Sequence, residues 1–118
     1  MQLSPLVALN DTGKPIISKV LAVPALRAKY IGFVREIAEK SLDWNAIGPV
    51  VAQYRALIAA DIARDTRKLY STEEFLSGTA DEGGPGTLRA FFEARRAFLL
   101  NWVAENAAVE KAAAAAAP

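Results

Sequence analysis

The sequence predicts an all-α fold, a small irregular bundle of four to five helices with a glycine-rich loop before the last helix. Apolar residues recur in three long segments at spacings of three and four residues, which places them on one helix face. No stretch alternates apolar and polar residues between hairpin turns, so no strand is expected. The chain has 118 residues, of which 53% are hydrophobic, which is enough for one modest core.

Three regions are expected along the chain: an irregular lead-in over residues 1–13, one helical domain over residues 14–106 and an alanine-rich tail over residues 107–118. In the lead-in, the run from Asn10 to Gly13 is a turn signal. Pro15 fits the first turn of a short helix over residues 15–22. Pro24 ends this helix and can open the next one.

The clearest helix is predicted over residues 24–42. Its expected core face is an apolar stripe of Leu26, Tyr30, Phe33, Val34 and Ile37. Asp43 stands where an N-cap would begin a further turn. Gly48-Pro49 is expected to interrupt the chain. The next helix is therefore predicted over residues 49–64, with the stripe Val50, Val51, Tyr54, Leu57, Ile58 and Ile62.

A capping box is predicted at Ser71 and Glu74, where each side chain would bond the other residue's amide. A short helix should follow and end near Gly78. Residues 78–86 carry four glycines but no lysine, so they form a loop that is not a phosphate-binding P-loop. The closing helix is predicted over residues 87–106. Core packing is favoured over a partner surface for its aromatic side chains, Phe91, Phe92, Phe98 and Trp102.

Composition excludes much chemistry. Cysteine and histidine are both absent, which removes thiolate nucleophiles, ordinary zinc sites and every histidine-based catalytic dyad or triad. The net charge of +1 gives no general attraction to polyanions, so we expect no nucleic-acid partner and no membrane partner. We also expect no signal peptide and no membrane-spanning segment, and the compartment stays open.

The candidate contact residues are two basic pairs, Arg67-Lys68 and Arg95-Arg96, together with Tyr70. Each pair has acidic neighbours, so ion pairs within the chain are favoured over contact with a phosphate. Asp61 and Asp65 share a helical spacing, but two carboxylates alone make at best a weak magnesium site. No catalytic, cofactor-binding or metal-binding residue is predicted.

Three further blocks follow one another along residues 14–100. They comprise a helix start with Leu21, Val23, Pro24, Arg27 and Tyr30; a connection with Asp65, Arg67, Lys68, Tyr70, Ser71, Glu74 and Phe75; and a closing helix with Arg95, Arg96, Phe98 and Leu99. In this order the blocks resemble the C-terminal part of the spore-coat CotH kinase family.

The resemblance implies relatives with an atypical protein-kinase-like fold, which use ATP and magnesium to phosphorylate serines of coat proteins. The family's nucleotide-binding lysine and metal-binding aspartates lie upstream of the matching block, and we find no counterpart here. Because phosphoryl transfer depends on such groups, we expect no cofactor and no catalysis by this chain alone.

We expect instead a non-catalytic helical module that packs against a kinase lobe or a partner protein. The alternative is a free-standing interaction protein that forms a homodimer through its aromatic closing helix.

Overall fold

A computed structural model describes residues 2–115. Its elements are α1 (Pro15–Ala22), α2 (Pro24–Glu36), the π-helical turn η1 (Ile37–Ser41), α3 (Trp44–Arg64), α4 (Thr72–Gly78) and α5 (Leu88–Ala115). No strand occurs within this range, so the predicted all-α class is confirmed. The last three residues of the predicted tail lie outside the described residues, and the division into three regions stays a prediction.

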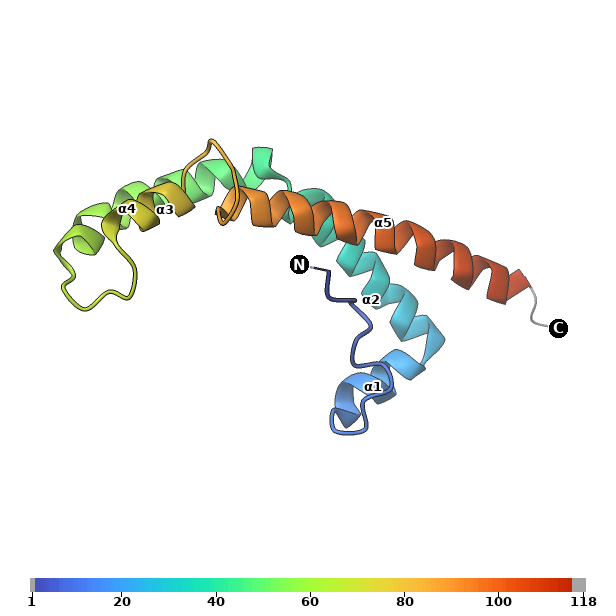
Figure 1. Ribbon diagram of the computed structural model, residues 1–118. Coiled ribbons are helices and arrows are strands. Elements are labelled where there is room, and N and C mark those ends of the chain that lie inside the picture. Colours follow the sequence, from blue (N-terminus) through green and yellow to red (C-terminus); the bar gives the residue numbers. More distant parts are fainter. Residues whose placement is uncertain (1, 116–118) are drawn as a thin grey trace.

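The helices form an open, elongated bundle. α5 lies across the point where α2 passes into η1, while α3 and α4 extend to one side and α1 to the other (Figure 1). α5 contacts α2, η1 and α3, and α1 contacts α2. The radius of gyration is 19.0 Å, whereas a compact domain of this length has about 13–14 Å. The bundle therefore encloses little interior.

The core is correspondingly small. The buried residues are Ala8, Leu21, Ile31, Ala38, Trp44, Leu99 and Val103. Eighteen large apolar side chains among the described residues are exposed. The accessible surface is 8465 Å², whereas a compact monomer of 12.7 kDa exposes about 6,200 Å². The elongated shape and the exposed large apolar side chains both contribute to this excess.

The predicted helix over residues 24–42 is observed as α2 followed by η1. Its last turn is π-helical, and the amide of Leu42 donates to the carbonyl of Ile37 at 3.0 Å. The face that packs inward contains the buried residues Ile31 and Ala38.

Three of the five residues in the core stripe predicted for this helix are exposed, so that part of the prediction is wrong. Leu26, Phe33 and Ile37 are 45%, 52% and 49% exposed. The three lie about a third of a turn around the helix from the face that packs inward, by the 3.6-residue period. Periodicity identifies residues that share a face, but it does not show that this chain supplies a cover for them.

α3 begins earlier than predicted. The Asp43 carboxylate accepts a hydrogen bond from the amide of Asn45 at 3.0 Å and so caps the helix at Trp44. Gly48-Pro49 therefore lies inside α3, and the predicted interruption is wrong. Pro49 removes one backbone donor near the helix start, while Gly48 leaves room for the indole of Trp44.

Most of the core stripe predicted on α3 is also exposed. Tyr54 and Leu57 are 61% and 72% exposed, whereas Val51 and Ile62 are partly covered. By length and composition alone, α3 is apolar enough to cross a membrane, and 6% of its most apolar stretch is buried. If the helix had begun at Pro49, as predicted, it would have been too short to cross a membrane. One such helix is weak evidence for a membrane, because a helix that docks on a partner has a similar composition.

The capping box of α4 is confirmed. The hydroxyl of Ser71 accepts from the amide of Glu74 at 3.0 Å, and the amide of Ser71 donates to the Glu74 carboxylate at 2.7 Å. In the following loop, Gly83, Gly84 and Gly86 have positive φ angles, which explains the glycine content. α5 then continues through residue 115, beyond the predicted end at residue 106.

Two helix glycines provide a matched test of the packing of Trp44. A Cβ on Gly32 would meet open space, whereas a Cβ on Gly48 would lie 3.0 Å from the indole nitrogen of Trp44. Alanine is favoured over glycine inside a helix by about 0.5–1 kcal/mol. We expect Gly32→Ala to raise the free energy of unfolding by about that amount, and Gly48→Ala to leave it unchanged or lower it. Urea denaturation followed by circular dichroism measures both, and equal stabilisation would contradict the packing.

Candidate functional site

Arg96 joins three elements at the centre of the molecule. From α5, its Nε donates to the carbonyl of Ala38 in η1 at 3.2 Å, and its Nη2 lies 3.4 Å from the carboxylate of Asp43. Asp43 is also the N-cap of α3. Both side chains are partly exposed. Arg96 therefore acts as a clamp that holds α5 against the junction between α2 and α3.

Arg95, the neighbouring candidate, contacts the N-terminal segment. Its guanidinium donates to the carbonyl of Leu3 at 2.8 Å and lies 5.1 Å from the ring centre of Phe98. The hydroxyl of Tyr30 in α2 donates to the carbonyl of Pro5 at 3.0 Å. Backbone carbonyls thus hold the lead-in against α5 and α2.

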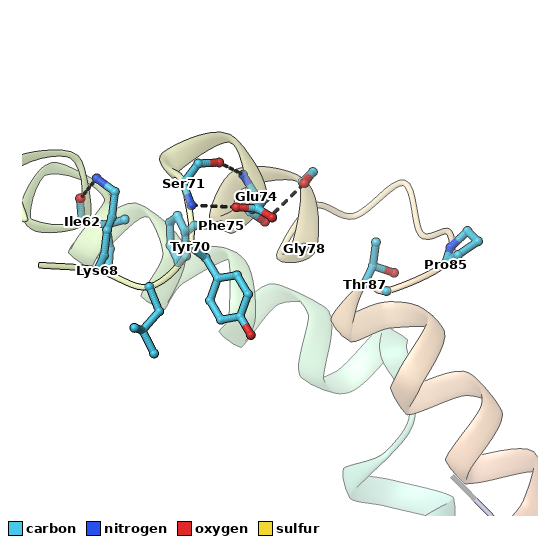
Figure 2. Close-up of a pocket in the computed structure, with 12 residues that line it drawn as sticks. Ile62, Lys68, Tyr70, Ser71, Glu74, Phe75, Gly78, Pro85 and Thr87 are labelled. Carbon is cyan, nitrogen blue, oxygen red and sulfur yellow. Dashed lines mark hydrogen bonds between the residues drawn. The ribbon is translucent and has the colours of Figure 1, made fainter. Parts of the chain in front are cut away.

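The other three candidate residues follow the end of α3, and two of them, Lys68 and Tyr70, line a cavity of about 640 Å³. Figure 2 shows Ile62 and Lys68 at one side of this cavity, Pro85 and Thr87 at the other, and the capping box of α4 between them. The ammonium group of Lys68 donates to the carbonyl of Ile62 at 2.9 Å. This bond provides a donor for a carbonyl group in the last turn of α3.

The remaining candidates point to no ligand. Tyr70 lines this cavity and is largely exposed. Arg67 is exposed, and its amide donates to the carboxylate of Asp65 at 2.8 Å. The cavity is open and its wall is mostly apolar.

The acidic pair of α3 is engaged within the chain. Asp61 forms an ion pair with Arg64 at 2.6 Å, while Asp65 accepts the amide of Arg67. Across residues 2–115, no three acidic side chains lie close enough together to hold a metal ion. In the described residues, the fold therefore adds no third acidic ligand to Asp61 and Asp65, the pair considered as a weak magnesium site.

One polar network was not predicted. The indole of Trp44 donates to the carboxylate of Asp81 at 2.5 Å, and the guanidinium of Arg89 donates to the carbonyl of Asp81 at 2.6 Å. A hydrogen bond to Glu93 at 2.8 Å raises the pKa of Arg89 above its usual value. Trp44 also packs edge-on against Phe92. The network ties the glycine-rich loop to α3 and α5, but Asp81 lies in a loop whose sequence carries no periodic signal.

Two apolar surfaces on the long helices are also uncovered. The first, here named the α2 strip, consists of Leu26, Phe33 and Ile37, and the ammonium group of Lys29 lies 5.9 Å from the ring centre of Phe33. The second, here named the α3 seam, consists of Ile47, Val50, Tyr54 and Leu57. Apolar patches of this kind mark surfaces that another macromolecule covers.

Comparison with known proteins gives one match. A family model described as CotH kinase protein matches residues 7–99 of the 118-residue chain. This range contains the three blocks on which the resemblance rests. No curated protein and no solved structure matches the chain.

The Arg96 clamp can be tested by removing its charge while keeping its length. We expect Arg96→Met to lower the free energy of unfolding by about 1–2 kcal/mol, because it leaves Ala38 and Asp43 without their donor in a partly screened site. Arg67→Met, at an exposed position, should change it by less than about 0.5 kcal/mol. Equal effects of the two variants in urea denaturation would show that the contacts of Arg96 with Ala38 and Asp43 do not stabilise the fold.

Proposed function

The chain belongs to the CotH kinase family, and from that premise we propose that it is a non-catalytic helical module that packs against a kinase lobe or a partner protein. The observation that carries this proposal is the uncovered apolar surface. Where the structure describes side-chain burial, seven residues form the core, whereas eighteen large apolar side chains are exposed. Isolated exposed apolar residues are ordinary, but aligned runs of them along two helices favour a docking role.

The composition of the chain supports the non-catalytic part of the proposal. Phosphoryl transfer requires metal-holding carboxylates and a cation positioned at the phosphates. The basic candidates serve other purposes: Arg95, Arg96 and Lys68 donate to backbone carbonyls of the chain itself. Their side chains therefore brace the helices, and of the three only Lys68 lines the 640 Å³ cavity.

The α2 strip is the surface that we assign to the kinase lobe. It continues from Val23, a residue of the block that carries the family resemblance and itself an exposed apolar side chain. Lys29 borders the strip at Phe33. An apolar centre with a charged rim is the usual anatomy of a protein–protein interface.

Absence of nucleotide binding is the first test. We expect isothermal titration of the purified chain with ATP and magnesium to show no saturable heat at roughly 100 µM chain, a concentration at which micromolar binding is readily seen. A full-length CotH-family kinase serves as the positive control. Saturable binding by the chain with one ATP per molecule would overturn the non-catalytic assignment.

Docking is the second test. The chain is co-expressed with the catalytic region of a CotH-family kinase from which the C-terminal helices have been removed, and we expect the two to co-purify in a 1:1 complex. Phe33→Asp should weaken the complex about tenfold or more, since a buried charge without a partner is costly. Leu69→Asp, at a side chain that is 94% exposed and off both surfaces, is the matched control. Failure to co-purify, or equal loss with both variants, would contradict docking through the α2 strip.

A further inference from the structure

We propose that the α3 seam is a self-association surface, on which α3 of a second copy of the chain packs antiparallel about a two-fold axis. This assignment is independent of the kinase lobe, which we place on the α2 strip. Val50, Tyr54 and Leu57 are 39%, 61% and 72% exposed, so the exposed fraction of the seam side chains increases toward the C-terminal end of the seam. Ile47 completes it at the other end and is partly covered.

The spacing of the seam is that of a coiled-coil contact. Ile47, Val50, Tyr54 and Leu57 are separated by three, four and three residues, so they form one straight row along the helix. The row lies about a quarter-turn or more from the face of α3 on which Trp44 and Val51 pack inward. A second helix can therefore approach the seam while α3 keeps its contacts with α4, α5 and η1.

Between Ile47 and Leu57, the seam face carries no charge that would oppose a second copy. Between residues 46 and 60, Arg55 is the one ionisable side chain apart from Tyr54. Its guanidinium is turned toward α4, where it donates to the carbonyl of Leu76 at 3.0 Å. A two-fold interface places each surface against itself, so an uncharged row is compatible with its own copy without like-charge contact.

One antiparallel register makes every layer apolar. In this register Ile47 faces Leu57 of the second copy, and Val50 faces its Tyr54, so that the four seam residues of each chain form four mixed layers. Beyond the last layer, Asp61 faces Asp43 of the second copy. Each carboxylate is paired within its own chain, Asp61 with Arg64 at 2.6 Å and Asp43 with Arg96 at 3.4 Å. The two Asp61 carboxylates of the dimer are about 27 Å apart along the axis, by the 1.5 Å rise per residue. That separation exceeds the Debye length of about 8–10 Å.

The uncovered area is sufficient for such an interface. A standard interface buries about 800 Å² on each partner. The chain exposes 8465 Å², which is roughly 2,200 Å² more than a compact monomer of its mass. One dimer face corresponds to less than half of this excess, which is spread over the whole elongated chain.

The structure also favours α3 over α5 as the self-association helix. The aromatic side chains Phe92, Phe98 and Trp102 of α5 are partly covered within the chain, and Phe92 packs against Trp44. Leu57 and Tyr54 are more exposed than any of these. A membrane surface is a poorer occupant of the seam, because helices that bind anionic lipid carry rows of lysine or arginine beside their apolar face.

Sedimentation equilibrium of the full chain tests the proposal. We expect a reversible dimer at roughly 100 µM chain, and Leu57→Glu should raise its Kd about tenfold or more by placing a charge in an apolar layer. Leu69→Glu, at a side chain that is also exposed but lies off the seam, should leave the Kd unchanged. A monomer at this concentration, or equal effects of the two variants, would overturn the proposal. Loss of kinase-lobe docking would not affect it, since that docking is assigned to the α2 strip.

Cross-linking tests the register without a destabilising charge. The chain contains no cysteine, so single-cysteine variants report one position each. In the proposed register, Tyr54→Cys places the two thiols within reach of a short bismaleimide, because packed helix axes lie about 8–10 Å apart. Phe33→Cys, on the α2 strip, is the matched control and should give no cross-linked dimer. Equal yields from both variants, or a monomer that co-sediments with vesicles of phosphatidylcholine and phosphatidylserine through α3, would contradict self-association at the seam.

Discussion

The arrangement of the whole chain depends on one guanidinium group. Arg96 reaches from α5 to the carbonyl of Ala38 in the π-helical turn and to the carboxylate of Asp43 that caps α3. A charge-assisted pair of this kind fixes direction as well as distance, because the guanidinium is planar. The same residue thereby links α5 to the end of the first long helix and to the N-cap of α3. Few other polar contacts in the described residues connect elements so far apart in sequence.

The crossing at Arg96 explains why so much apolar surface stays uncovered. α3 and α4 leave it in one direction, while α1 and the first part of α2 leave it in another (Figure 1). Side chains near the crossing, such as Ile31, Ala38 and Leu99, are buried. Side chains of the α2 strip lie on another face of the same helix, those of the α3 seam lie on a different face of α3 from Trp44, and both sets face solvent. A chain built this way is suited to hold other protein surfaces at two separate places, and it has little interior in which to shape a reaction centre.

Local structure was largely predictable from the sequence, whereas burial was not. The short helix after Pro15, the N-cap at Asp43 and the capping box at Ser71 each depend on a few neighbouring residues, and each was predicted. The break expected at Gly48-Pro49 was wrong because the Asp43 cap starts α3 one turn earlier and Trp44 packs over Gly48. Phe33 and Leu57 were assigned to a core because apolar periodicity is the same whether the covering surface belongs to the same chain or to another. The partners of Arg96 could not be predicted, since they depend on how α5 crosses η1.

Hydroxyl-radical footprinting of the chain, alone and in complex with a CotH-family kinase lobe, tests most directly whether the uncovered surface is a docking surface. Phe33 and Leu69 are both exposed in the isolated chain and provide a probe and a reference in the same molecule. Docking through the α2 strip predicts that Phe33 becomes protected from oxidation in the complex while Leu69 is oxidised as before. Equal oxidation of Phe33 with and without the lobe would contradict a docking role for this surface.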